Sequence, residues 1–268
     1  MQYDIDIKKL KKNINYDNFM IDKNNIDKEV NISTMTICCH FENTEIKCHR
    51  IAKFIKLGTN YVVACGNNSL IKKKRKPKKN ENLNKRPFLN QISLKILVPD
   101  KLQNKPVNVK LFKNGSVQMT GCVTLQNSLD ALVRVCNILS IKIKKKSLCD
   151  NKNLIDSVTK YNICMINSNF DIGFCIDRNR LLKILKDEKL DVMFDSTSHA
   201  GVKIKYTIGE VVITLLIFEK GKIIITGVKD FKQLKNAYDF INHLLLKYYS
   251  EIFKLSNKIV LQIAKQWI

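Results

Sequence analysis

The chain has 268 residues and is 45% hydrophobic, so it is long enough to bury a core and to form one or two domains. Its 47 basic and 24 acidic residues give a net charge of +23, which predicts nucleic acid or an anionic membrane surface as the partner. No apolar run approaches the roughly 20 residues of a spanning helix, so we expect no membrane partner. No secretory signal precedes the nine cysteines, so we expect reduced thiols.

The first elements are a polar extension and a strand. Residues 1–29 lack a hydrophobic period, and we expect a loosely attached extension, either a short helix or a disordered arm. A strand is predicted from Asn31 to about Phe41, followed by a second strand or a helix through Ile51.

Two cysteine–histidine groups lie in this segment, Cys38-Cys39-His40 and Cys48-His49. Thiols and imidazoles that are close together can bind zinc. Adjacent residues of a strand point to opposite faces, however, and no C-x-x-C spacing is present. We therefore expect ordinary sheet packing, with no metal and no cofactor.

Residues 58–87 form a long insert that contains a block of like charge. Such a block should be a solvated loop. It is expected to contact phosphates, to act as a nuclear-localisation signal, or to be only a basic surface loop. The basic residues of the block are Lys72, Lys73, Lys74, Arg75, Lys76, Lys78 and Lys79.

An alternating strand follows from Gln91 to Val98, and the segment 107–121 is predicted to be a hairpin with Asn114-Gly115 at its turn. A helix is expected from about Ser128 to Leu139. A second basic patch at 142–146 and a linker at 147–156 precede strands near 158–166 and 170–176. Next come a helix from its N-cap Asp177 to about Lys186 and a strand at 201–208.

The segment 211–227 is a second predicted hairpin, with Gly221 at its turn and valine and isoleucine in both arms. A helical stripe at 231–253 and a helical tail after Ser256 complete the chain. Both faces of this hairpin are apolar, and one helix can cover only one of them. The other face is therefore buried by elements elsewhere in the chain, or it binds a partner.

The two hairpins share one register. Phe112, Gly115, Thr120 and Gly121 recur as Phe218, Gly221, Thr226 and Gly227 at a constant offset of 106 positions. A register shared across strand, turn, strand and helix predicts an internal duplication. We expect an extension at 1–29, a first repeat at 30–146 with the insert 58–87, a second repeat at 147–255 and a tail at 256–268.

These hairpins resemble those of the TATA-binding protein (TBP) family. Leu-Ile-Phe-x-x-Gly-Lys-x-x-x-Thr-Gly, from Leu216, and Lys-Leu-Phe-x-x-Gly-x-x-x-x-Thr-Gly, from Lys110, carry the resemblance, with weaker matches at 31–37 and 161–164. The composition and the basic insert are most similar to the TBP-like proteins of large nucleocytoplasmic DNA viruses. The resemblance implies an α+β, TBP-like saddle of two pseudo-symmetric repeats, each a curved antiparallel sheet with helices on its convex face.

The resemblance also implies a function. It predicts a transcription-initiation factor, not an enzyme, whose concave sheet lies in the minor groove of A/T-rich promoter DNA and bends it. Implied partners are double-stranded DNA, a factor similar to transcription factor IIB and RNA polymerase, with the protein a monomer. The implied location is intracellular: the host cytoplasm (viral factory), the nucleus or the virion. The acidic loop through which TBP meets transcription factor IIB has no clear match at 191–195.

Matched position by position, the resemblance implies DNA contacts in both repeats. Phe112 and Phe218 match wedge phenylalanines of the third strands, Phe88 matches one of a second strand, and His199, a poor wedge, stands at the fourth such position. Each phenylalanine is alternatively a core residue. Asn31 and Asn162 match asparagines that hydrogen-bond to base edges. The full implied set is Asn31, Phe88, Lys110, Phe112, Gln118, Thr120, Asn162, His199, Lys205, Leu216, Phe218, Ile224 and Thr226.

The first repeat departs from the family pattern. Lys110 and Gln118 replace apolar residues on the implied DNA face, whereas the second repeat keeps Leu216 and Ile224, so we expect asymmetric contact. The alternative is a non-sequence-specific nucleic-acid-binding, architectural or packaging protein that keeps the TBP fold. The chain has no carboxylate cluster, metal set or nucleophile motif that would favour an enzyme.

Overall fold

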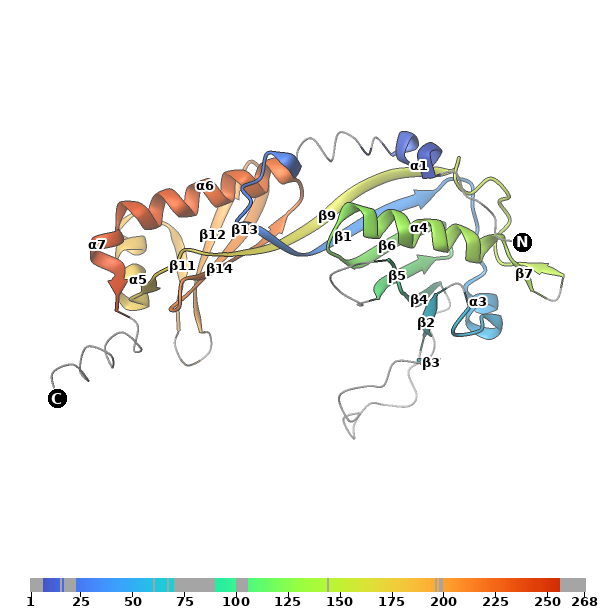
Figure 1. Cartoon of the computed structure of the whole chain (residues 1–268), viewed down its shortest axis with the longest axis horizontal. Coiled ribbons are helices and arrows are strands. Elements are labelled where there is room, and N and C mark those ends of the chain that lie inside the picture. The colour runs from blue at the N-terminus through green and yellow to red at the C-terminus, as the bar shows by residue number, and fades with distance from the viewer. Residues whose placement is uncertain are drawn as a thin grey trace. The chain divides into compact units, whose positions relative to one another are not determined.

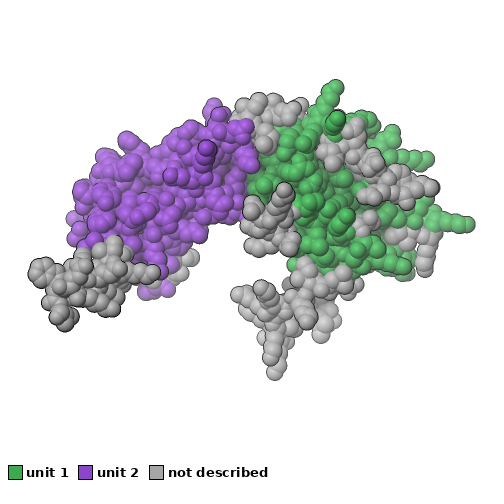
Figure 2. All heavy atoms as spheres, viewed as in Figure 1, with its two compact units in different colours: residues 1–18, 34–164 green, residues 19–33, 165–268 purple. Residues whose placement is uncertain are grey.

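A computed structural model describes residues 7–14, 16, 23–59, 61–66, 68–69, 90–99, 106–143, 145–195, 197 and 200–255. The chain divides into two units (Figure 2): unit 1 comprises residues 1–18 and 34–164, and unit 2 comprises residues 19–33 and 165–268. In each unit an antiparallel sheet carries its long helix on one face (Figure 1). None of the helices in the described residues has the length and hydropathy needed to span a bilayer.

The sheet of unit 1 is covered by α4 (Leu125–Ser140), which packs on β5 and β6, and by α3 (Cys48–Phe54), which packs on β4. Its spatial order is β1 (Asn31–Phe41, from residue 34 onward), β6 (Ser116–Cys122), β5 (Val107–Phe112), β4 (Gln91–Ile96), β2 (Val62–Cys65) and β3 (Asn68–Ser69). The strands β7 (Lys142–Ile143) and β8 (Lys146–Ser147) form a separate small hairpin.

The sheet of unit 2 is covered by α6 (Phe231–Lys247), which packs on β14, and by α5 (Arg178–Asp187), which packs on β11 and β12. Its spatial order is β9 (Val158–Asp171, from residue 165 onward), β14 (Lys222–Val228), β13 (Val211–Phe218), β12 (Gly201–Ile208) and β11 (Asp191–Met193). After α7 (Tyr249–Ile252), β15 (Phe253–Lys254) pairs with β10 (Cys175–Ile176).

The structure confirms the predicted duplication, because the two hairpins have the same turn geometry and the same spacing of elements. Gly115 and Gly221 have φ values of +88° and +83°, and each donates its N–H over 3.0 Å to the carbonyl of the preceding phenylalanine, Phe112 or Phe218. The strands β6 and β14 begin 106 positions apart, as do the helices α4 and α6. The same local sequence therefore builds the same hairpin and the same following helix twice.

The long helices begin at equivalent N-caps. Thr124 accepts a hydrogen bond from the Asn127 N–H (3.2 Å), and Asp230, 106 positions later, accepts one from the Gln233 N–H (2.7 Å). Each cap satisfies an N–H that has no partner within its helix.

Replacing either cap, in Thr124→Ala or Asp230→Ala, should lower the free energy of unfolding by about 1 kcal/mol. Urea unfolding followed by circular dichroism measures this loss. Asp230→Asn keeps an accepting oxygen and should unfold close to the wild type. An alanine variant with an unchanged midpoint would show that the cap contributes nothing to stability.

The core lies between each sheet and its helices. In unit 2 the inward side chains Ile213, Leu215 and Ile217 are fully buried, and they alternate with half-exposed or exposed neighbours. Unit 1 repeats this alternation along β5, where Val109 and Leu111 are buried. The second apolar face of the unit 2 hairpin is thus the face opposite α6, and its side chains keep part of their surface exposed.

Three expectations about local structure are wrong. Residues 7–14 are not loosely attached, because α1 (Ile7–Asn13) buries Leu10 completely and Lys9 pairs with Asp156 at 2.6 Å. Residues 170–176 are not one strand: β9 continues through Asp171, since β14 offers it pairing partners as far as that residue, and the short strand β10 follows at Cys175–Ile176. The predicted helix at 231–253 also ends earlier, at Lys247, and a short turn of helix follows it.

Candidate nucleic-acid interface

The face of each sheet opposite its long helix, called the open face here, carries cross-strand rows of partly exposed side chains. A row across the middle of unit 1 consists of Ser93, Lys110, Gln118 and Cys38. The equivalent row in unit 2 consists of Lys203, Leu216, Ile224 and Asn169. These two sets are the central rows, and their second and third members lie 106 positions apart.

The central rows differ in chemistry at their two inner strands. Unit 1 places Lys110 directly opposite Gln118, and unit 2 places Leu216 directly opposite Ile224. All four side chains are half-buried. Among the described residues, no hydrogen bond or ion pair engages the Lys110 ammonium or the Gln118 amide. Both polar groups are therefore available to a ligand lying on the open face.

A neighbouring row in each unit carries a threonine and a lysine. Thr120 accepts a hydrogen bond from Asn108 (3.3 Å), whereas Thr226 donates one to Asn167. The outer-strand lysine of unit 2, Lys205, lies 3.6 Å from Asp191, so it is already paired with a carboxylate. The full rows are Lys95, Asn108, Thr120 and Thr36 in unit 1, and Lys205, Thr214, Thr226 and Asn167 in unit 2.

Phe112 and Phe218, the two wedge candidates that the structure describes, are the last residues of β5 and β13, and both are half-exposed. Phe218 lies opposite Gly201, and a Cβ added to that glycine would be only 3.2 Å from the ring atom Cε1. The Phe218 ring thus rests on bare backbone at the open face. Phe112 instead lies opposite Gln91.

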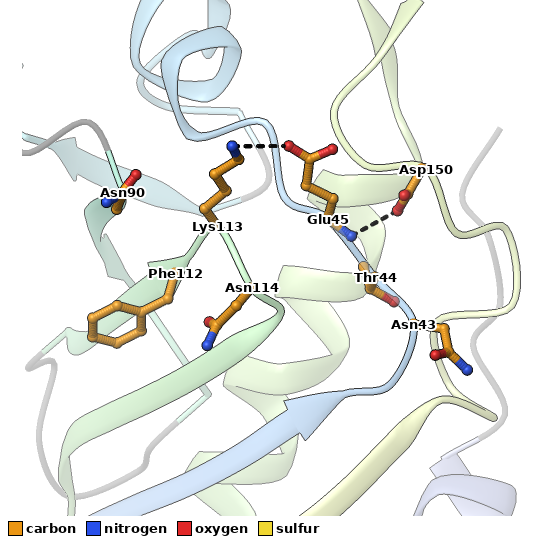
Figure 3. A pocket seen from close by; sticks show the side chains of 8 residues that line it. All are labelled: Asn43, Thr44, Glu45, Asn90, Phe112, Lys113, Asn114 and Asp150. Atoms are coloured by element: carbon orange, nitrogen blue, oxygen red, sulfur yellow. Dashed lines mark hydrogen bonds and ion pairs between the residues drawn. The ribbon is translucent and has the colours of Figure 1, made fainter.

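Each phenylalanine borders a hollow beside its hairpin turn. The hollow next to Phe112 has a volume of about 740 Å³, and in it Lys113 extends toward Glu45 at 3.5 Å while the ring points away from this ion pair (Figure 3). The hollow next to Phe218 measures about 570 Å³. Glu219 occupies the position equivalent to Lys113, so the first residue of the turn is acidic in unit 2 and basic in unit 1.

Glu219 is held by two cations. Arg178 lies 2.6 Å from its carboxylate and Lys254 lies 2.8 Å from it. The hydrogen bond from Lys254, with Arg178 in addition, lowers the pKa of Glu219, so this turn keeps a carboxylate at neutral pH. The Arg178 guanidinium also donates to the Ala200 carbonyl (2.6 Å), which ties α5 to the chain just before β12.

Both predicted asparagines lie on an open face. Asn162 donates to the Cys164 sulfur (3.6 Å), and that thiol lies 2.7 Å from Cys38, the last member of the unit 1 central row. Asn31 is exposed two residues before Ser33, which accepts from Asn169 at 2.5 Å. Residues two apart in a strand share a face. The two asparagines therefore take equivalent positions, one in each unit.

The Cys38 thiol on this surface resists ionisation. Burial, together with the neighbouring Cys164 thiol, raises its pKa to about 12. As predicted, Cys39 points to the opposite face, where it is buried. In the described part of the chain, no group of three or more histidine, cysteine, aspartate or glutamate side chains could hold a metal ion.

Comparison with known proteins identifies the family of the chain. A family model described as transcription factor TFIID (or TATA-binding protein, TBP) matches residues 160–248. A "TATA-box-binding protein-like" protein of Acanthamoeba polyphaga mimivirus is 32% identical over 273 residues, covering 89% of this chain and 72% of that protein. The chain belongs to the TBP family. Methanococcus jannaschii TBP shares its fold, with a TM-score of 0.53 at 14% identity over 82% of this chain and 98% of that chain.

The predicted α+β TBP-like fold and the resemblance to viral TBP-like proteins are thereby confirmed. Of the residues predicted to contact DNA, those described by the structure lie on the open faces of this TBP-like chain. Phe88, His199 and the basic block at 72–79 lie outside the described residues.

Sequence reasoning missed several open-face residues of this TBP-like protein. Lys95 was missed, although the strand pairings place it equivalent to Lys205, which the sequence had predicted and which lies 110 positions later. Unequal loops hide this offset in the sequence, and only the pairing of β4 with β5 and of β12 with β13 reveals it. The other missed residues are Ser93, Asn108, Asn167, Asn169 and Lys203.

Proposed function

We propose that this TBP-like protein is a transcription-initiation factor that places its open faces in the minor groove of A/T-rich promoter DNA and bends it. The observation that carries the proposal is the apolar open face of unit 2. There Leu216, Phe218 and Ile224 are half-exposed and Val212 is 53% exposed. A surface of this kind on a strongly basic protein favours a partner that combines phosphate charge with flat apolar bases.

The minor groove explains why such a surface would select A·T pairs. An A·T pair shows only acceptors there, whereas a G·C pair adds the guanine amino donor. Against Leu216 and Ile224 that donor would lose its water and gain no acceptor. A buried donor left unpaired costs about 1–3 kcal/mol, so each G·C pair on this surface would weaken binding.

Bending requires side chains that enter between base steps. Apolar wedges such as phenylalanine unstack a step and kink the duplex toward the major groove. Phe218 and Phe112 suit this role, because each lies at the end of an open-face strand beside a hollow. Phe88 is proposed as a third wedge from the sequence alone.

Phosphate contacts would supply much of the affinity. Lys95 and Lys203 lie on the outer strands β4 and β12 of the open faces. The block at 72–79 adds further positive charge. Each phosphate neutralised releases counterions, so binding should weaken as salt rises.

The proposal includes recruitment of RNA polymerase through a partner similar to transcription factor IIB, with the protein a monomer. No catalytic activity is proposed. Within an infected cell, the place of action would be the host cytoplasm (viral factory), the nucleus or the virion. The edge strand β11 replaces the acidic loop used by TBP, and its Asp191 is paired with Lys205, so we expect partner contacts unlike those of TBP.

The test is a fluorescence binding and FRET bending assay with an A·T-rich and a G·C-rich duplex at moderate and raised salt. We expect an A·T preference that persists in raised salt and is accompanied by bending. Equal, salt-labile binding without bending would support the alternative, an architectural or packaging protein. A variant with the basic residues of 72–79 changed to glutamine should bind every duplex less tightly and flatten the salt dependence.

A further inference from the structure

The central rows hold one lysine each, but on different strands. In unit 2 the lysine is Lys203, on the outer strand β12, and the inner strands carry Leu216 and Ile224. In unit 1 the outer strand β4 carries Ser93, and the lysine is Lys110 on the inner strand β5, opposite Gln118 on β6. Outer strands suit phosphates at the groove edges, whereas inner strands face the base edges.

Lys110 and Gln118 together match the minor-groove edge of a G·C pair. The two are directly opposite in an antiparallel pair, so their Cβ atoms lie about 5 Å apart. The Gln118 carbonyl oxygen can accept a hydrogen bond from the guanine amino group, and the Lys110 ammonium can donate to guanine N3 or cytosine O2. Leu216 and Ile224 offer no such acceptor at the equivalent place.

From this contrast we infer that the protein reads an asymmetric site: Lys110 and Gln118 accept a G·C pair in the half that contacts unit 1, whereas Leu216 and Ile224 restrict the other half to A·T pairs. The inference rests on the proposed minor-groove binding. It assigns the polar residues of unit 1 a role in specificity rather than a loss of function. A site with unlike halves would also fix the direction in which the protein lies on DNA.

An inosine scan with the full-length wild-type protein tests the inference. Each base pair of a duplex selected for tight binding is replaced in turn by G·C or by I·C, since inosine lacks the 2-amino group that guanine places in the minor groove. In one half we expect G·C to weaken binding roughly tenfold per position and I·C to restore it. In the other half, one or two positions should tolerate G·C within about twofold, and I·C should bind no better there.

A reciprocal exchange of the inner residues assigns the halves. Lys110→Leu with Gln118→Ile should make the tolerant half reject G·C but accept I·C. Leu216→Lys with Ile224→Gln should make the strict half tolerant. All four positions are half-buried at equivalent register, and thermal melting confirms that each variant folds. If a variant does not fold, the wild-type inosine scan alone decides.

Two results overturn the inference, and they are distinguishable. If the protein binds and bends DNA but G·C is penalised equally in both halves, with I·C restoring both, then the role of Lys110 and Gln118 is wrong while the proposed function stands. If binding is indifferent to base composition and no bending occurs, the proposed function fails as well.

Discussion

Phe218→Ala should weaken binding to an A·T-rich duplex by roughly ten- to a hundredfold, corresponding to the ~1–3 kcal/mol that aromatic stacking on a base contributes. It should also reduce the bend, because a wedge that no longer enters a base step cannot hold the kink. The side chain is half-exposed at the end of β13, so the fold should tolerate its loss. Equilibrium binding and FRET bending with one labelled duplex measure both effects.

The neighbouring glycine supplies a matched control. A methyl group on Gly201 would meet the Phe218 ring and the Ile217 carbonyl oxygen, each at 3.2 Å, so Gly201→Ala should displace the ring and reproduce part of the loss of bending. In a Phe218→Ala background, the same change should have little further effect on bending, since no ring is left to displace. Its contact with the Ile217 carbonyl would remain and would affect stability alone. Phe112→Ala tests the equivalent ring in unit 1. If Phe218→Ala lowers thermal stability but leaves affinity and bend unchanged, the ring is structural.

Gly221→Ala should destabilise unit 2 by more than about 3 kcal/mol, because backbone strain and a steric clash add at this position. The residue has φ +83°, and a Cβ there would collide with the Phe174 carbonyl oxygen. The equivalent Gly115 has φ +88°, with the Phe41 carbonyl oxygen 2.5 Å from the added Cβ. A backbone carbonyl cannot move aside as a flexible side chain could.

Gly173→Ala separates the two causes. This glycine has φ +79°, close to that of Gly221, but an added Cβ would meet nothing within 4 Å. It should therefore cost only the strain of a left-handed residue, about 1 kcal/mol. Urea unfolding midpoints of the two variants give the comparison. Equal losses would mean that the close approach of the Phe174 carbonyl to Gly221 contributes nothing.

Local chemistry made the hairpins and several helix boundaries predictable. The glycine turns and the N-cap at Asp177 depend only on neighbouring residues, and the repeat was visible as a constant offset. The structure confirms these features. Asp177, for example, accepts from the N–H groups of Asn179 (3.0 Å) and Arg180 (3.1 Å). Helix α1 was not predictable in this way, because it is attached to a distant part of the chain: Asn13 donates to the carbonyl of Ile155, 142 residues away in sequence. Its attachment is a tertiary effect that a search for hydrophobic periodicity does not detect.

The candidate interface was predictable only in part. The hairpin motif was enough to predict Phe112, Phe218 and the two threonines, because each phenylalanine and its threonine lie within one continuous stretch of sequence. Lys95 and Lys203 were missed because their places on the open face follow from the pairing of β4 with β5 and of β12 with β13. The contact between Cys38 and Cys164, which are 126 residues apart, depends on strand pairing across a long interval.

The division of the chain has an evolutionary consequence. Unit 2 includes residues 19–33, of which the last four belong to the start of the first repeat, and there Ser33 accepts from Asn169. Unit 1 likewise includes Cys164, whose thiol meets Cys38 although it follows the start of the second repeat. A gene encoding one such repeat alone would leave its sheet short of a strand segment, and two copies could complete each other by exchange. We infer as the simplest ancestor a strand-swapped homodimer whose gene was duplicated and fused, after which the two open faces could diverge and one could become polar.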